Sequence, residues 1–183
     1  MNITLINGND PGQNKGFEDY MSRLNNELVH NHDVEWFHLQ ALSIKDCLGC
    51  FGCWQKTPGQ CIFKDDMASL IIAYLHSDLV LFASPLILGF PSALLKTSHD
   101  RLIPIIHPYT EIKNGELHHE ARYKKYPKLG LLMEKEVDTD EEDIKIITDI
   151  YTRIAFSFKS ALVYLTFINT KSPEEIAHEI GHC

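Results

Sequence analysis

Four cysteines lie within fifteen residues of this chain. Cys47, Cys50, Cys53 and Cys61 follow the spacing C-x2-C-x2-C-x7-C. Iron–sulfur clusters are held by sets of Cys thiolates, whereas a structural zinc site usually takes its ligands from two separated pairs. Cysteines three residues apart pair poorly as disulfides, and the total of five is odd. The compact triplet therefore favours a [4Fe-4S] cluster. Zinc, or a turn of reduced thiols without metal, is the alternative.

A second motif is the glycine-rich run GNDPGQNKG at 8–16, which leads into a helical pattern. Unpaired backbone N–H groups at a helix N-terminus bind phosphate. Four side chains could add donors to such a loop: Asn9, Gln13, Asn14 and Lys15. The run is neither a Walker loop nor a G-x-G-x-x-G fingerprint, so an ordinary turn remains the alternative.

The third candidate is PLILGFP at 85–91, which follows an apolar strand pattern. Its prolines and glycine stiffen the backbone. An apolar, preorganised loop suits a flat heteroaromatic ring that packs on the loop and hydrogen-bonds to its backbone. The alternative is a buried loop that only supports the following helix.

Short apolar runs alternate with amphipathic segments, which is typical of a parallel sheet flanked by helices. The predicted strands are 2–7, 34–39, 78–85, 129–134 and 161–169. The predicted helices are 17–30, 65–75, 92–102, 138–158 and a short last helix that begins with the capping box at 172–175. Residues 104–127 show no clean period and indicate an ordered insertion in what we expect to be a single domain, 1–183.

We predict a three-layer α/β sandwich with five parallel strands in the order 2-1-3-4-5. In such a doubly wound sheet the ligand crevice lies at the carboxyl ends of strands one and three. The loops at 8–16 and 85–91 would meet there. The cysteine loop leaves the carboxyl end of strand two, so we expect the thiolates beside the same crevice.

Composition excludes several functions. The net charge of −8 argues against a nucleic-acid groove or an anionic membrane surface as partner. No apolar run approaches the ~18 residues that a membrane span needs. Free cysteines without a signal-peptide pattern predict a cytoplasmic location.

Other residues with chemical potential have simpler interpretations. His107, His118 and His119 could ligate a metal but fit solvated or hydrogen-bonded positions better. Asp100-Arg101 indicates a structural ion pair, and Asp65-Asp66 indicates charges that cap a helix. Trp54 is expected to shield the thiolates or to anchor its loop.

Together these motifs resemble the flavodoxin-like NAD(P)H-dependent FMN reductases, and within them the iron–sulfur flavoproteins. The similarity lies in LINGN at 5–9, in residues 47–67, in SDLVLFASPLILGFPSALLKTSHDRL at 77–102, and in the strand–helix order. It covers most of residues 1–105.

The resemblance implies that FMN binds between the first and third loops, with the cluster on the four cysteines. The expected cofactor-binding residues are Asn9, Gly12, Gln13, Asn14, Lys15 and Gly16 at the phosphate, with Ser84, Pro85, Leu86, Ile87, Leu88 and Gly89 at the ring. The sequence departs from the family pattern twice. No hydroxyl residue lies between Thr4 and Tyr20, and the third loop carries aliphatic side chains where the family often has an aromatic one.

The leading hypothesis is an oxidoreductase that passes hydride from NAD(P)H to FMN, with the cluster relaying electrons to a small-molecule or protein acceptor. Hydride transfer needs no acid–base side chain, so no catalytic residue is predicted. The alternative is a cluster- or metal-binding sensor or scaffold with a vestigial flavin crevice. We also predict a homodimer or higher homo-oligomer, because the insertion carries tyrosines that suit an interface.

Overall fold

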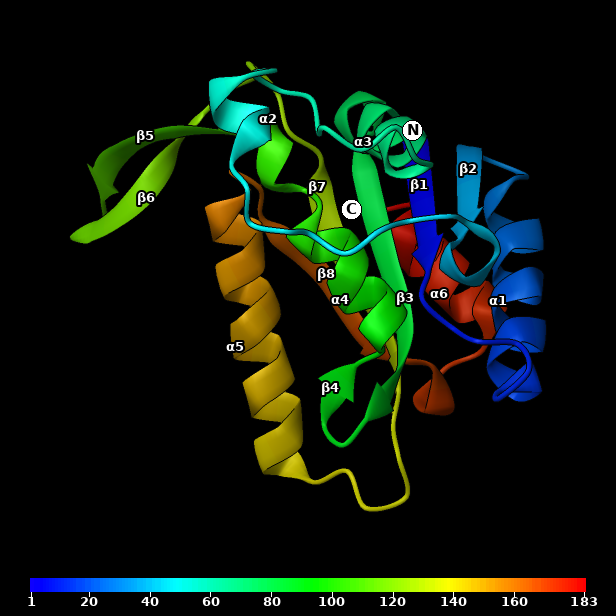
Figure 1. The fold of residues 1–183 in the computed structure, drawn as a ribbon. Helices are drawn as coiled ribbons and strands as arrows, with labels where there is room; N and C mark the ends of the chain where they lie inside the picture. The colour runs from blue at the N-terminus through cyan, green and yellow to red at the C-terminus, as the bar shows by residue number, and fades with distance from the viewer.

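A computed structural model describes all residues, 1–183, and its centre is a sheet of five parallel strands (Figure 1). The strands are β1 (Asn2–Asn7), β2 (Asp33–His38), β3 (Leu79–Ile87), β7 (Lys128–Glu134) and β8 (Leu162–Phe167). Their order across the sheet is β2-β1-β3-β7-β8, which confirms the predicted 2-1-3-4-5 arrangement. A short strand, β4 (Phe90–Pro91), pairs antiparallel with the end of β3.

Helices cover both faces of the sheet (Figure 1). Helices α1 (Lys15–Leu28) and α6 (Pro173–Ile180) close a smaller core around Ile3 and Leu5. Helices α3 (Met67–His76), α4 (Ala93–Asp100) and α5 (Glu141–Ser157) close the larger core on the opposite face. The remaining helical segments are α2 (Gly52–Gln55) in the cysteine loop and three 3-10 turns, η1 (Leu39–Ala41), η2 (Ile103–Ile105) and η3 (Ile168–Thr170). None of these helices combines the length and the apolar character that crossing a membrane requires.

Side-chain caps fix where four helices begin. Asn14 accepts from the N–H of Phe17 at the start of α1, and Ser92 accepts from the N–H of Leu95 at the start of α4. Asp140 and Ser172 form reciprocal capping boxes at α5 and α6. The box at Ser172 was predicted from the sequence, whereas the predicted start of α5 lay a few residues too early.

The insertion at 104–127 is mainly a β-hairpin, β5 (Ile106–Lys113) with β6 (Glu116–Ala121), which extends away from the body of the molecule (Figure 1). Its turn is Asn114-Gly115, and both residues have positive φ, 53° and 79°. A tight hairpin turn of this kind needs positive φ at both central residues, which Asn-Gly adopts readily. The insertion therefore contains two regular strands, although its sequence shows no clean period.

Candidate functional site

A cavity of about 460 Å³ lies at the carboxyl ends of β1 and β3. Both predicted loops form its walls: Gly8, Asn9, Gln13 and Asn14 come from the first, and Pro85, Leu86 and Ile87 from the third. The start of α4 and Gln40 complete the lining. The two predicted loops therefore meet in one crevice at the switch point of the sheet.

Gly8 allows the two walls to approach each other. Its N–H donates to the carbonyl of Ala83 in β3 at 2.8 Å, and its carbonyl accepts from Ser92 Oγ at 2.6 Å. A Cβ at Gly8 would lie 2.8 Å from the Cβ of Leu95 and 2.9 Å from Ser92 Oγ. Any side chain here would push the first loop away from α4 and distort the crevice.

The third loop, expected as an apolar and preorganised loop, is a short hairpin. β3 continues to Ile87, which pairs with Phe90, and the turn consists of Leu88 and Gly89 at φ 53° and 74°. Leu88 and Gly89 do not line the crevice, and Leu88 is 86% exposed. The ring wall is therefore shorter than the predicted run, 84–89.

Ser84 is the third residue of the predicted ring wall that does not line the crevice. It is fully buried in β3, where its hydroxyl accepts from the N–H of Ser92 at 2.9 Å and donates to the carbonyl of Pro85 at 2.8 Å. Those bonds hold the hairpin against the start of α4. Its role in this geometry is structural.

In the first loop, the predicted amide donors are already used inside the chain. Asn9 Nδ2 donates to Glu18 at 3.1 Å and to the Asn14 carbonyl at 2.9 Å, and Gln13 Nε2 donates to Asp10 at 3.0 Å. Asn14 Nδ2 donates to Glu134, at the end of β7. The role of these three amides at a phosphate therefore stays a prediction: Asn9 uses both of its amide hydrogens inside the chain, whereas Gln13 and Asn14 each use one.

The other groups of the first loop are the backbone and Lys15. The Gly12 N–H is also capped by Asp10, at 2.9 Å. The N–H groups of Lys15 and Gly16, in the first turn of α1, donate to no group of the chain, as is usual at a helix start. Asn9 Oδ1 is buried without a hydrogen-bond partner, so toward the crevice Asn9 is an acceptor.

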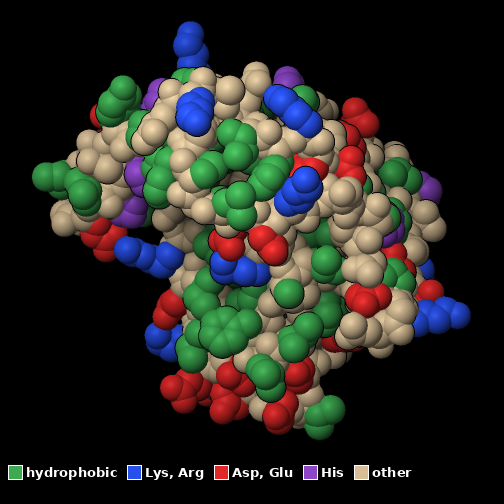
Figure 2. All heavy atoms as spheres, in the orientation of Figure 1, with side chains coloured by type: hydrophobic (Ala, Val, Ile, Leu, Met, Phe, Trp, Pro, Cys, Tyr) green, Lys and Arg blue, Asp and Glu red, His purple; other side chains and the backbone are tan.

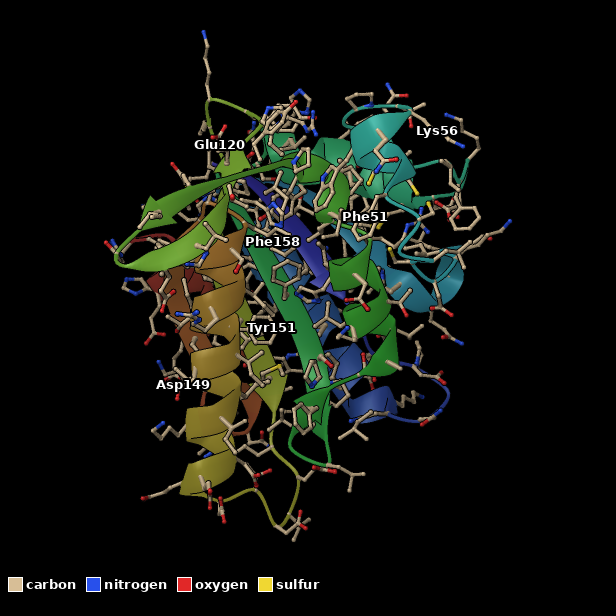
Figure 3. The ribbon with its side chains drawn as sticks, turned by 60° about the vertical axis from the view of Figure 1, so that its left-hand side comes forward. Phe51, Lys56, Glu120, Asp149, Tyr151 and Phe158 are labelled. Atoms are coloured by element: carbon tan, nitrogen blue, oxygen red, sulfur yellow. The ribbon has the colours of Figure 1, made fainter.

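The four cysteines line a second cavity, of about 510 Å³, between the cysteine loop, α4 and α5. Its wall is mostly apolar and includes Phe51 from the loop and Phe158 from the end of α5, which lie near each other in Figure 3. Lys96, His99 and Asp100 of α4 form its polar side. All four thiols therefore share one space, as the motif predicted.

The thiols are grouped but not arranged around one centre. Cys47 and Cys50 are exposed, while Cys53 and Cys61 are partly buried. Burial, followed by the charges of the neighbouring thiols led by Cys61, raises the pKa of Cys53. No set of three or more His, Cys, Asp or Glu side chains anywhere in the chain is positioned to hold a metal ion. The loop is therefore not a preformed single-ion site.

The backbone of the cysteine loop is unusual between its second and third cysteines. Phe51 has φ 54° and ψ 16°, the left-handed conformation, at the start of α2. A bulky residue pays a steric penalty of about 1–2 kcal/mol there. Such conformations persist where surrounding structure enforces them, and they cluster at functional sites.

A buried ion pair closes the base of this loop. Arg101 Nη1 and Nη2 donate to the two carboxylate oxygens of Asp65 at 2.8 and 2.9 Å, and Nη1 also donates to the Lys45 carbonyl. The Lys45 N–H donates to Asp65 at 3.0 Å, and the Ser43 N–H donates to Asp66 at 2.7 Å. The predicted pairing of Arg101 with Asp100 was wrong, because Asp100 pairs with Lys96 instead. Asp65 and Asp66, which were predicted to cap a helix, therefore connect the segment after the cysteine loop to the segment before it, at Ser43 and Lys45.

The cysteine cavity and the crevice share no lining residue. The crevice reaches Ala93 and Leu94 at the start of α4, whereas the thiols lie along its second half, at Lys96, His99 and Asp100. From Leu94 to Asp100 the helix rises about 9 Å. We expected the thiolates beside the crevice: the loop leaves the same edge, and the thiols lie in a separate cavity farther along α4.

Trp54 and the histidines of the insertion have structural contacts. Trp54 Nε1 donates to the Ile106 carbonyl at 3.0 Å, and its ring packs on Phe51 and His119. His118 is 8% exposed, contacts Glu116 at 2.9 Å and packs edge-on against Phe156. The indole therefore anchors the cysteine loop to the base of the hairpin.

The family follows from the sequence. Residues 1–119 match the model of the NADPH-dependent FMN reductases, which is more than half of the chain. The chain belongs to that family. The matched segment contains both loops of the crevice and all four motif cysteines.

Among curated relatives, an iron–sulfur flavoprotein of Archaeoglobus fulgidus is 37% identical over 75 residues, which span 41% of this chain and 33% of that protein. The chain thus matches about a third of that relative's length. Among solved structures, azoreductase AzrA has a TM-score of 0.65 at 12% identity and covers 98% of this chain and 91% of its own. An FMN-dependent NADH-azoreductase of Bacillus anthracis str. Ames Ancestor, solved with FMN, has a TM-score of 0.62 at 14% identity, with 98% and 99% covered. At such identities these structures support the fold alone.

The crevice of this family member is apolar on the side of the third loop. The ring end offers an apolar wall of Pro85, Leu86 and Ile87 in a cavity of suitable size. On the side of the first loop, Asp10 lines the crevice, whereas Lys15, Gly16 and Glu134, which accepts from Asn14, do not line it.

Proposed function

We propose that this chain is an FMN-dependent oxidoreductase that uses NADH or NADPH and passes electrons onward through a [4Fe-4S] cluster on Cys47, Cys50, Cys53 and Cys61. One observation carries the flavin assignment: the first and third loops of a family member close around one crevice at the switch point. The final acceptor is a small molecule or a redox protein.

Flavin, when bound, supplies the hydride chemistry, and the protein supplies orientation and electrostatics. The side chains of Pro85, Leu86 and Ile87 would hold the ring and exclude water from one of its faces. The first turn of α1 would bind the far end of the ligand. No side chain is needed to move a proton, so we name no catalytic residue.

The cluster assignment is supported by the chemistry of the donor set. Four thiols line one mostly apolar cavity, with His99 and Asp100 on its polar side, and thiolates are the ligands of iron–sulfur clusters. The thiols have no common centre in this conformation, so the cluster assignment rests on the type of ligand and not on the arrangement of the sulfur atoms. The curated relative named iron–sulfur flavoprotein matches part of the same chain. Free cysteines also favour a reducing compartment, the cytoplasm.

Anaerobic purification followed by flavin, iron and sulfide assays tests the proposal. We expect added FMN to bind with quenching of its fluorescence, and the bound flavin bands to bleach with NADH or NADPH. We also expect about four iron and four sulfide per chain for one cubane. A protein that takes up no flavin would contradict the proposal. Bound FMN without iron would contradict the cluster assignment and favour a reductase that uses flavin alone.

The alternative of a sensor or scaffold makes a different prediction in the same assay. Iron and sulfide without flavin uptake would favour it. Family membership argues against this alternative, because the family is named for FMN reduction.

A further inference from the structure

The end of the crevice that would receive a flavin phosphate is rich in hydrogen-bond acceptors. Asp10 caps the Gly12 N–H at 2.9 Å and holds Gln13 Nε2 at 3.0 Å, so a carboxylate of the chain occupies the position of an anion in this turn. Asn9, which is 2% exposed, presents a buried Oδ1 without a partner to the same cavity. An amide oxygen accepts hydrogen bonds and cannot donate one to a phosphate.

The acidic character continues along the rim. Outside the lining, Glu134 accepts from Asn14 of the first loop, and Glu136 accepts from the Gly89 N–H of the hairpin turn at 3.2 Å. Asp143 Oδ1 would lie 3.0 Å from a Cβ placed on Gly89. Figure 2 shows Asp and Glu side chains gathered at the bottom of the molecule, where Figure 1 draws the start of α5 and the segment before it.

We propose that this crevice selects flavins by their ring and hydroxylated chain and discriminates against the phosphate. It then takes riboflavin at least as well as FMN and uses FMN as an exchangeable substrate rather than as a tightly held group. This inference rests on the proposed flavin oxidoreductase function. The unpartnered Asn9 oxygen suits a ligand hydroxyl, which can donate to it. The dianionic phosphate meets two nearby carboxylates, whereas riboflavin carries no charge there.

Salt provides a test on the unmodified protein. Affinities for riboflavin and FMN are measured by fluorescence quenching at low and high ionic strength. Salt screens repulsion between exposed charges, so FMN binding should strengthen as salt rises while riboflavin binding stays constant. A site built for phosphate would show the reverse for FMN.

Isosteric amides test the residues. Asp10→Asn and Glu134→Gln remove the charge and keep one accepting oxygen each; at Asp10 that oxygen can serve either the Gly12 N–H or Gln13 Nε2, which now share the two carboxylate oxygens. Together they should raise FMN affinity about tenfold relative to riboflavin, because removing charge contacts is worth on the order of one tenfold step. Asp149→Asn is the matched control, since Asp149 lies on the outer side of α5 (Figure 3), is 63% exposed and pairs only with Lys145.

The outcomes separate this inference from the function on which it rests. FMN that binds the unmodified protein tenfold or more tightly than riboflavin at low salt would overturn the inference and leave the flavin function intact. Absence of binding for either flavin would overturn both. Riboflavin binding equal to or tighter than that of FMN, together with strengthening of FMN by salt, supports the inference even if the amide variants do not fold.

Discussion

Arg101 and Asp65 form a buried, bidentate ion pair, with side chains only 1% and 5% exposed, across thirty-six residues of sequence. Arg101 comes from the end of α4, and Asp65 from the stem that follows the last motif cysteine. The guanidinium also faces the Phe63 ring at 5.2 Å. The pair therefore fixes the base of the cysteine loop against the helix that borders both cavities.

Removing one partner of this pair should be costly. Arg101→Gln or Asp65→Asn leaves the other charge buried, and such changes cost about 3–5 kcal/mol. We expect that loss in the free energy of unfolding, measured with urea. Lys96→Gln is the control, because the Lys96–Asp100 pair is exposed and worth about 0.5 kcal/mol. If Lys96→Gln lowers the free energy of unfolding as much as Arg101→Gln does, burial does not account for the strength of the Arg101–Asp65 pair.

His99 should make stability depend on pH. Burial lowers the pKa of this histidine from 6.5 to about 4. Since the folded protein then binds fewer protons than the unfolded chain between those values, stability is full above 6.5 and falls as the pH drops toward 4. His99→Gln should lack this part of the decline. His30→Gln, at an exposed position, should keep the full decline in stability. Urea unfolding curves of the unmodified protein and the two variants, recorded at several pH values, measure the difference.

Leu88 occupies a turn position that its side chain disfavours. The hairpin turns Leu88-Gly89 and Asn114-Gly115 have nearly the same φ values, 53° and 74° against 53° and 79°. Asn tolerates this conformation and Leu does not. Leu88→Asn should therefore raise the free energy of unfolding by about 1 kcal/mol, and Asn114→Leu should lower it by a similar amount. Urea unfolding of the two variants checks both signs, and a loss of stability in Leu88→Asn would contradict the account.

The same two turns illustrate what the sequence could reveal. Asn114-Gly115 is a strong hairpin signal, so the insertion was predictable in principle, although we interpreted the segment as irregular. Leu88-Gly89 carries no such signal, because a leucine rarely adopts positive φ. The hairpin after β3 therefore required the structure. The sheet order was predictable because apolar strand runs and helix caps act locally.

The candidate site was only partly predictable, because its details depend on distant partners. The loops that form the crevice were identified correctly from their glycines, prolines and positions after strands. The carboxylates of Glu18 and Glu134, which hold the amides of Asn9 and Asn14, come from α1 and the end of β7. The path of the cysteine loop depends on Arg101, far along the chain. No local pattern encodes such pairings.

The hairpin should mediate self-association. Ile112 and Leu117 are direct cross-strand partners on it and are 81% and 70% exposed. Exposed apolar pairs on a projecting element are typical of contact surfaces, and most soluble oligomers are closed homo-oligomers. We expect a homodimer by light scattering at micromolar concentration, and a monomer for Ile112→Ser with Leu117→Ser. Val137→Ser is the control at an exposed residue of another loop. A monomeric unmodified protein would contradict this prediction.

The tyrosines that first suggested this interface are less suited to it. Tyr109 is 66% exposed, but the Tyr126 hydroxyl donates to the Ile105 carbonyl at 2.6 Å and accepts from the N–H of Arg122 at 2.8 Å. Tyr126 therefore fixes the end of the hairpin to the body. The double serine variant leaves that anchor intact, so a change of mass would report on the exposed face alone.

The cysteines provide the final prediction. If Cys47, Cys50, Cys53 and Cys61 hold a cubane, replacing any one of them with Ser should abolish the brown colour and lower the iron content. The fold should survive, because the loop lies outside both cores apart from Trp54 and the residues at its stems. Circular dichroism and an iron assay after anaerobic reconstitution measure the two effects.

Cys183 is the matched control. It lies at the end of α6, where its thiol contacts only the Glu179 carbonyl at 3.6 Å, and it lines neither cavity. Cys183→Ser should therefore keep the iron content of the unmodified protein. A colourless protein that contains one zinc per chain would instead indicate a zinc site and contradict the cluster. Four thiols that titrate freely in the reconstituted protein, with no metal bound, would contradict any metal role, because thiolates that hold a cluster are not available to a thiol reagent.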